Sequence, residues 1–224
     1  MEILSSLLFI IFICVINIQC QTYFRDIKKI HLNDNDYYFV VLTDGLYLYN
    51  YNLLDCVKLF SFNSTVYKGS DDIIILTNLE NENGSYILCL INKYLFIYNI
   101  NHKALNYYLL DDIDISKDNY CNLMPYNINN NNPNFFIVLY KKGTKTLNFY
   151  CYDFNNANKI LNKLYQESFD NVNITDDKIN CQINAYLSYI NCFYYYKINN
   201  TNYLASTIFS VDKNNINLKN NFFF

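Results

Sequence analysis

Hydrophobic and polar positions form a regular pattern near the start of the chain, in residues 37–52. Two apolar runs flank Asp44 and Gly45. Leu46 and Leu48 fall on one face of the second run and its tyrosines on the other, because side chains alternate along a β-strand. The first run is almost wholly apolar, as is typical of a strand covered on both faces. An Asp-Gly pair between two such runs predicts a β-hairpin with its turn at these two residues.

The same unit recurs along the chain at a spacing of about 50 residues. An apolar run opens each unit, in residues 38–42, 86–90, 136–140 and 189–193. A turn and a second run follow, and in the first unit residues 57–62 and 72–76 predict a third and a fourth strand. Three or four strands repeated at this spacing are typical of the blades of a β-propeller.

The remaining stretches complete an all-β prediction. Residues 158–169 place three aliphatic side chains at helical spacing, but the stretch also fits the third strand of the third unit, and we expect a strand. Residues 111–134 and 210–221 predict loops. The sequence therefore predicts a β-propeller-like array of about four blades, with an incomplete ring as one form of it. A β-sandwich is the alternative, since it shares the alternation and the turn spacing but not the repeat.

The hairpin of residues 37–52 resembles the middle strands of generic β-propeller blades, and the likeness extends over residues 36–210. It rests on the pattern alone: there is no Trp, hence no Trp-Asp dipeptide, and no double glycine of the kelch type. Composition, cysteines and architecture together also resemble those of the cysteine-rich propeller antigens of malaria-type parasites. The resemblance implies a propeller fold and carries over no individual residue.

The first 20 residues are mostly apolar and end in a short polar segment. The apolar stretch of about 16 residues is shorter than the roughly 20 that a membrane span needs, and it fits a signal peptide. An uncleaved anchor is the alternative, because Glu2 replaces the usual basic start and Ile18 is bulky for a cleavage site. No later apolar run is long enough to span a membrane. We therefore expect residues 1–20 to be a signal peptide, residues 21–224 to form a single domain, and the protein to enter the secretory pathway.

Six cysteines remain after residue 20. An even number behind a secretory signal predicts disulfide bonds, with a mixture of free buried thiols as the alternative. Cys192 takes the place of Cys89 in the repeat, and Cys181 would lie beside it on the neighbouring strand. Opposed residues on adjacent strands are close enough for a disulfide, so we expect Cys181–Cys192. The same preference for a partner within the unit gives the two remaining pairs, Cys121–Cys151 and Cys56–Cys89.

Four Asn-x-Ser/Thr sequons are candidate glycosylation sites: Asn63, Asn83, Asn173 and Asn199. They suit a secreted chain. In a sequence so rich in asparagine several would arise by chance, so they add little to the prediction of compartment.

Few residues are suited to catalysis or to holding a cofactor. Arg25 is the only arginine, which excludes recognition of a carboxylated sugar by an arginine cluster of the sialidase type. The acidic group Asp111, Asp112 and Asp114 offers carboxylates for a glycosidase or for calcium, but a solvated loop is its more ordinary role. The glycines are dispersed and no Gly-x-Ser-x-Gly elbow occurs. We expect no catalytic residue and no cofactor.

Metal and nucleic-acid binding are not expected either. His31 and His102 are the only histidines and no Cys-x-x-Cys spacing occurs, so a zinc site is improbable. The net charge of −3 argues against nucleic acid, which requires basic stripes.

Binding of a protein partner is the function that remains. The chain contains 24 Tyr, and tyrosine can dominate interfaces. Residues 192–197 would expose an aromatic row if they lie on an edge, although filling the space between blades is the more ordinary role. The alternatives are a glycan-binding or degenerate glycosidase-like propeller, and a truncated member of a larger family.

Overall fold

The computed structural model describes residues 24–32, 35–50, 55–63, 66–67, 74–81, 84–113, 115, 119–126, 133–184, 189–199, 201–212 and 215–223. These residues form sixteen β-strands. The predicted signal peptide, residues 1–20, lies outside them. No helix with the length and apolar character of a membrane span occurs in the described ranges.

The strands form four separate sheets, and each sheet pairs four consecutive strands antiparallel in sequence order. The first sheet contains β1 (Phe24–Leu32), β2 (Asn35–Leu42), β3 (Gly45–Asn50) and β4 (Asp55–Ser61). The second contains β5 (Ile74–Asn81), β6 (Gly84–Ile91), β7 (Tyr94–Asn99) and β8 (Ala104–Leu109). The third contains β9 (Asn119–Tyr126), β10 (Asn134–Lys141), β11 (Thr146–Asn155) and β12 (Ile160–Phe169). The fourth contains β13 (Ile174–Asn184), β14 (Tyr189–Ile198), β15 (Thr201–Asp212) and β16 (Asn215–Phe223).

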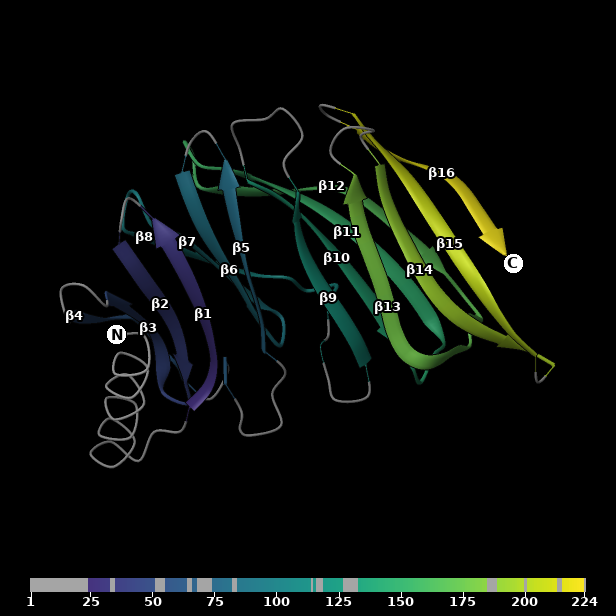
Figure 1. Cartoon of the computed structure of the whole chain (residues 1–224), viewed down its shortest axis with the longest axis horizontal. Coiled ribbons are helices and arrows are strands. Elements are labelled where there is room, and N and C mark those ends of the chain that lie inside the picture. Colours follow the sequence, from purple (N-terminus) through teal and green to yellow (C-terminus); the bar gives the residue numbers. More distant parts are fainter. Residues whose placement is uncertain are drawn as a thin grey trace.

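The four sheets follow one another in a row, and the first and fourth sheets lie at opposite ends of it (Figure 1). The first strand of each sheet lies beside the first strand of the next: β1 beside β5, β5 beside β9, and β9 beside β13. This is the blade arrangement of a β-propeller. The predicted all-β, β-propeller-like array of four blades is therefore confirmed, and the alternative of two sheets packed as a sandwich does not describe the molecule.

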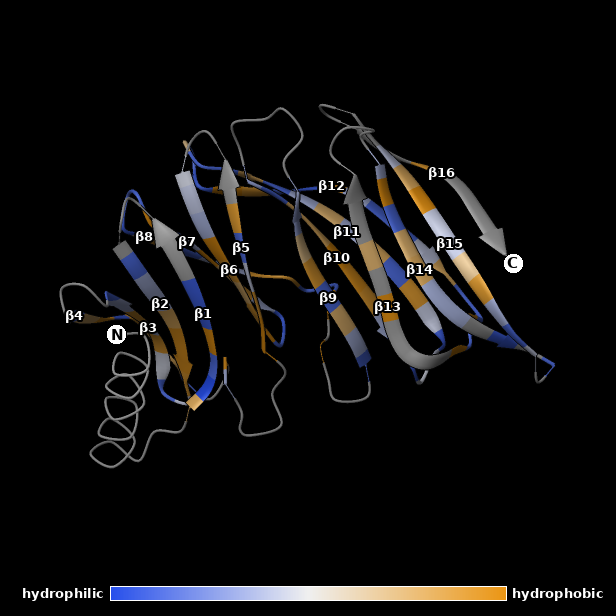
Figure 2. Ribbon diagram, in the orientation of Figure 1, coloured by the Kyte–Doolittle hydropathy of each residue, from blue (hydrophilic) through white to orange (hydrophobic). Residues whose placement is uncertain are grey.

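Three hydrophobic cores lie between successive sheets. Between the first and second sheets, Phe39 and Leu46 meet Phe96 and Tyr98. The other two cores are built alike, from Leu88, Leu95, Phe135 and Tyr152, and from Phe136, Phe149, Tyr194 and Phe209. The middle strands β6 and β10 are buried on both faces, which explains their continuous apolar runs, seen along both strands in Figure 2.

The turn between β2 and β3 lies one residue earlier than predicted. Leu42 pairs with Gly45, so the turn consists of Thr43 and Asp44, and Gly45 begins β3. Gly45 has no left-handed φ. Its requirement is steric, because a Cβ there would lie 2.1 Å from the carbonyl oxygen of Phe60 on β4. The Asp-Gly pattern thus located the hairpin, but close approach of two strands is the reason for the glycine.

Two predicted loops contain strands. β9 lies within residues 111–134, and β16 covers most of residues 210–221. Both are edge strands of their sheets, where polar residues are tolerated and the ladder partner decides the conformation. The predicted fourth strand of the first unit, residues 72–76, belongs from Ile74 onward to β5 of the second sheet. The strand predicted in residues 158–169 is confirmed as β12.

Candidate functional site

The structure forms the predicted disulfide Cys181–Cys192 between β13 and β14. The two cysteines are direct cross-strand partners, and their Cα atoms lie 4.0 Å apart. Directly opposed residues on neighbouring antiparallel strands are close enough for a disulfide. Both side chains face the core between the third and fourth sheets. The bond therefore fixes the register of the last sheet where the repeat predicted it.

The other two predicted disulfides do not form, because each would have to cross a sheet. Cys121 faces the core between the second and third sheets, whereas Cys151 faces the core between the third and fourth. Cys89 lies between the first and second sheets, and Cys56 pairs with Tyr49 on the opposite face of the first sheet. All four are free thiols. Burial raises the pKa of Cys121 and Cys151 to about 12, so both stay protonated at neutral pH.

The predicted glycosylation sites differ in accessibility. Asn63 and Asn199 are exposed, and Asn173 is half-buried. Asn83 lies outside the described residues. Glycosylation of these four asparagines stays a prediction.

The acidic residues considered for catalysis lie on a turn after β8. Asp111 and Asp112 are exposed, and Asp112 forms an ion pair with Lys163 of β12. Asp114 lies outside the described residues, and His102 is exposed on another turn. Among the described residues, no group of three or more His, Cys, Asp or Glu could hold a metal ion.

An apolar surface lies between the last strands of the first and second sheets. Val57 of β4 is 49% exposed, and Tyr107 and Leu109 of β8 are 56% and 48% exposed. Val57 pairs with Leu48 and Tyr107 pairs with Phe96, and both partners belong to the core between these sheets. Because cross-strand partners share a face, β4 and β8 present these side chains toward each other. We name this surface the rim wedge, formed by Val57, Leu59, Phe60, Tyr107 and Leu109.

Aromatic rings form the floor of the rim wedge. The ring centroid of Phe60 lies 5.0 Å from that of Phe96 and 5.2 Å from that of Tyr107. Phe62 continues the group, 6.1 Å from Phe96, and stacks on Tyr67 at 5.8 Å. Each such pair contributes about 0.5–1.5 kcal/mol beyond the area it buries, so the ring contacts stabilise the floor.

Hydrogen bonds close the junction between the second and third sheets. The hydroxyl of Tyr108 on β8 donates to the backbone carbonyl of Lys159, at 2.7 Å. The hydroxyl of Tyr150, on β11 of the third sheet, donates to the backbone carbonyl of Asp112 on the turn after β8, at 3.2 Å. Each tyrosine fills apolar space with its ring and satisfies its hydroxyl on the neighbouring sheet or turn.

The junction between the third and fourth sheets is closed in the same way. Tyr120 of β9 donates to the carbonyl of Ile179 at 2.6 Å, and Tyr140 of β10 donates to that of Val172 at 2.9 Å. The Tyr140 hydroxyl also accepts from the amide of Ile174, at 3.3 Å. Four tyrosines therefore donate hydrogen bonds across these two junctions: Tyr108, Tyr120, Tyr140 and Tyr150.

The outer face of the first sheet, turned away from the second, carries paired charges. Lys29 and Asp36 form an ion pair at 2.9 Å. Lys58 and the hydroxyl of Tyr47 both donate to Oδ2 of Asp44, at 2.6 and 2.7 Å. Burial acts to raise the pKa of Asp44, but these hydrogen bonds to the carboxylate outweigh it and the pKa is lowered.

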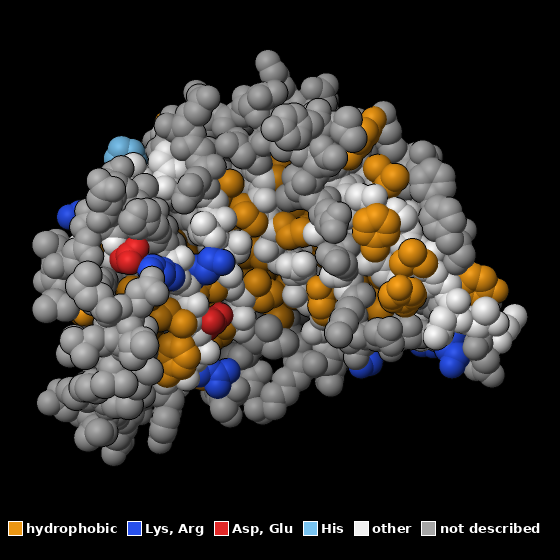
Figure 3. Space-filling model, viewed as in Figure 1, with side chains coloured by type: hydrophobic (Ala, Val, Ile, Leu, Met, Phe, Trp, Pro, Cys, Tyr) orange, Lys and Arg blue, Asp and Glu red, His pale blue; other side chains and the backbone are white. Residues whose placement is uncertain are grey.

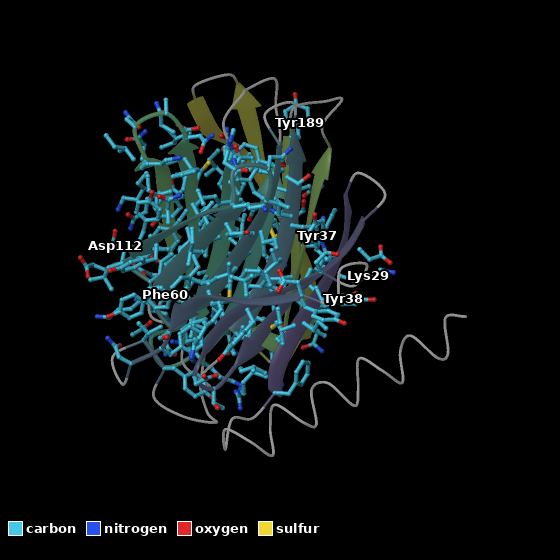
Figure 4. The ribbon with its side chains drawn as sticks, turned by 90° about the vertical axis from the view of Figure 1, so that its left-hand side faces the viewer. Lys29, Tyr37, Tyr38, Phe60, Asp112 and Tyr189 are labelled. Atoms are coloured by element: carbon cyan, nitrogen blue, oxygen red, sulfur yellow. A yellow bond between two sulfur atoms is a disulfide. The ribbon has the colours of Figure 1, made fainter. Side chains whose placement is uncertain are left out.

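Tyrosine rings connect these charges across the same face. The Lys29 ammonium lies over the Tyr38 ring, 5.9 Å from its centroid, and the rings of Tyr38 and Tyr49 are 6.3 Å apart. Figure 4 looks toward this end and shows Lys29 and Tyr38 on one side of the molecule, with Phe60 of the rim wedge on the other. The first sheet therefore offers two chemically different surfaces, one ionic and one apolar.

Sequence reasoning missed the rim wedge. Tyr107 and Leu109 alternate in a short run that reads as half-buried strand, and Val57 occurs in a similar run. The available signal was position: each run is the fourth strand of its unit, hence an outer edge of a propeller blade. Without knowing where the first strand began, that position could not be assigned.

No family of known proteins matches the chain, and no curated protein matches it. Among solved structures, one similar chain comes from the complex of the fission yeast SREBP–SCAP binding domains. It is 12% identical, with a TM-score of 0.47 over 89% of this chain and 60% of that one. A second is the WD40 domain of SCAP from fission yeast, 11% identical, with a TM-score of 0.30 over 92% of this chain and 67% of that one. The chain thus spans less than two thirds of the length of the first match.

Proposed function

We propose that the chain is a secreted, disulfide-stabilised module that binds a protein partner through the rim wedge and carries out no chemistry. The observation behind this proposal is the concentration of exposed apolar side chains on two facing strands, β4 and β8. Soluble proteins rarely expose grouped apolar side chains unless the surface binds something. The apolar first 20 residues and the Cys181–Cys192 bond support a secretory compartment.

The rim wedge suits an extended peptide segment. β4 and β8 are the last strands of their sheets, so each has one edge without a partner strand in its sheet. A peptide can add to such an edge through main-chain hydrogen bonds, with every second side chain reaching the same face. On this face the peptide would meet Phe60 and Tyr107. The site therefore favours segments with an aromatic or aliphatic residue at alternate positions.

The acidic pair Asp111 and Asp112 does not have the arrangement of a glycosidase. Asp111 and Asp112 are neighbours on an exposed turn, and Lys163 engages one of them. A glycosidase instead holds two carboxylates apart on either side of the scissile bond. The glycosidase-like alternative is therefore the weaker one, and glycan binding forms a separate arm of the test.

A displayed library of random peptides provides the test, because the natural partner is not needed. We expect selection on the purified protein to enrich extended peptides with alternating aromatic or aliphatic residues. Tyr107→Asp should weaken the selected peptides at least tenfold, since it places a charge on the apolar floor. Ile160→Asp is the matched control, because Ile160 is also exposed on a last strand, β12, outside the rim wedge.

Three outcomes would overturn the proposal. They are a failure to enrich any peptide, equal binding by the two variants, and selective binding to a glycan array in place of peptides. Circular dichroism of both variants checks that the loss does not come from unfolding.

A further inference from the structure

The fourth sheet has an outer face that no other described sheet covers. Alternate residues of β14 and β15, including Cys192, Tyr194 and Phe209, pack on the third sheet. The residues between them therefore point the other way. We name these the outer face of the fourth sheet: Tyr189, Asn191, Phe193 and Tyr195 on β14, and Leu204, Ser206, Ile208 and Ser210 on β15.

This face occupies the positions that pack on a following sheet elsewhere in the array. In the third sheet, Phe136, Val138 and Tyr140 of the middle strand face the fourth sheet and are buried. In the repeat, Tyr189 takes the place of Phe136, and Phe193 takes the place of Tyr140. Tyr195 is 49% exposed, and Phe193 is only half-buried. The outer face is thus built like a junction between blades.

The centre of the outer face holds no charge among its described side chains. Lys197 lies at the end of β14, away from this centre. Ser206 donates to Oδ1 of Asn191 at 2.7 Å, so these two polar side chains bond each other within the face. Because they are already paired, covering them carries a smaller desolvation cost than covering unpaired groups. Figure 3 shows hydrophobic side chains gathered over β14 and β15, with basic side chains at the lower edge beneath them, whereas side chains of both charges gather at the end formed by the first sheet.

We propose that a second copy of the same chain covers this face, packed through its own fourth sheet about a two-fold axis. The uncharged centres of two identical faces can meet without burying an ion, with Lys197 of each copy at the margin. Packing the fourth sheet of one copy on the first sheet of another would instead cover the ion pairs Lys29–Asp36 and Lys58–Asp44 with apolar groups.

The size of the face agrees with a stable dimer. The whole four-stranded face measures about 30 Å by 20 Å, so it offers at most about 600 Å² per copy. Complete burial of both faces would cover about 1,200 Å², the lower end of the range for specific interfaces. Sheets that pack face to face keep their strands within about 30° of alignment, which both copies can adopt by symmetry.

Sedimentation velocity of the purified protein at concentrations up to about 100 µM measures the association, since a dimer with a Kd near 10 µM is mostly formed there. We expect the wild-type protein to reach the mass of two chains. Tyr195→Lys should raise the dimer Kd at least tenfold, because it buries a charge at the interface, and Tyr195→Phe should keep the dimer. Tyr107→Asp, in the rim wedge, should leave the dimer unchanged and so separates this test from that of the proposed function.

A wild-type protein that stays monomeric throughout this concentration range refutes the proposal. Equal dimerisation of wild type and Tyr195→Lys refutes it as well, since the interface would then lie elsewhere. Because Tyr195 is exposed, the lysine variant should keep the circular dichroism and melting temperature of the wild type under monomeric conditions.

Discussion

The first and fourth sheets share one topology and differ in how their outer faces meet water. On the first sheet, lysines and aspartates pair beside tyrosine rings, so the face is satisfied in solvent. On the fourth sheet, aromatic and aliphatic side chains surround one Asn–Ser hydrogen bond. The contrast is plain in Figure 3. Alternation alone makes a blade, whereas the residue types on its outer face decide whether that face suits solvent or, as we propose for the fourth sheet, a second copy of the chain.

The two end sheets also differ in how they are held to the middle of the molecule. The first sheet meets the second largely through aromatic rings, such as Phe39 against Tyr98 and Phe60 against Phe96. The fourth sheet adds a hydrogen bond from Tyr120 to its backbone and a disulfide within it. The following changes test this difference.

Phe209→Ala should give the largest loss of stability. Phe209 is fully buried, and its ring centroid lies 4.8 Å from that of Phe149 and 5.4 Å from that of Phe136. Removing such a ring leaves a cavity and costs about 3–5 kcal/mol of the free energy of unfolding. Urea denaturation measures the loss, and hydrogen exchange should show that it falls mainly on β13–β16. A cost below about 1 kcal/mol would mean that the fourth sheet does not depend on this core.

Removing the disulfide should give the next largest effect. The double variant Cys181→Ala/Cys192→Ala avoids leaving an unpaired thiol and opens a loop with a sequence separation of 11. Loop entropy predicts a loss of about 2–3 kcal/mol in the free energy of unfolding. Hydrogen exchange of the β13–β14 amides should rise while that of β2 and β3 stays constant. Equal increases at both ends would contradict a local role for this bond.

Gly45→Ala should weaken the first sheet by about 1–3 kcal/mol, the usual cost of overpacking. The new Cβ would lie 2.1 Å from the carbonyl oxygen of Phe60, so β3 and β4 must separate. Gly143→Ala is the control, because a Cβ there has no neighbour within 4 Å. It should leave the melting temperature unchanged or raise it slightly. Similar melting temperatures for the two variants would show that β3 and β4 can shift freely.

Asp44→Asn should have the smallest effect, visible mainly as a change with pH. The pKa of Asp44 is lowered in the folded chain from the ordinary 3.8, so its ion pair adds stability above that value and loses it as the pH falls below. The pair is partly exposed, which limits its contribution to less than about 1 kcal/mol. Denaturation at pH 6 and at pH 3 should show a smaller difference for Asp44→Asn than for the wild type. Lys58→Gln should behave like Asp44→Asn, and wild-type pH dependence in both variants would exclude the ion pair as its source.

The sequence predicted the middle of each sheet better than its edges. Strands β6 and β10 are buried on both faces, and their unbroken apolar runs carry that information directly. β9 contains Asn119, Asn122 and Pro125, which resemble loop residues when the neighbouring strand is unknown. Its conformation comes from pairing with β10, for example Asn122 with Val138. Edge strands are therefore decided by tertiary partners rather than by their own composition.

The cysteines show the same limit. Cys181–Cys192 could be predicted because the two residues are opposed within one hairpin, a local relation. Cys121 and Cys151 also lie in one sheet, but on opposite faces. Knowing that two cysteines belong to the same repeat unit does not show which face of the sheet each one occupies. Face assignment requires the register across three strands. The rim wedge could not be predicted from the sequence for a related reason, because its residues come from two different sheets.

Each sheet is formed by one uninterrupted stretch of chain whose strands pair with their sequence neighbours. Such local pairing closes only short loops, so little entropy is lost before contacts form. A growing chain can therefore complete one sheet as soon as its fourth strand has left the ribosome, before the next is synthesised. During that interval the apolar face that will meet the next sheet stays open, and at the first sheet this includes Phe39 and Leu46. The speed of translation thus sets how long each of these apolar faces stays exposed before the next sheet covers it.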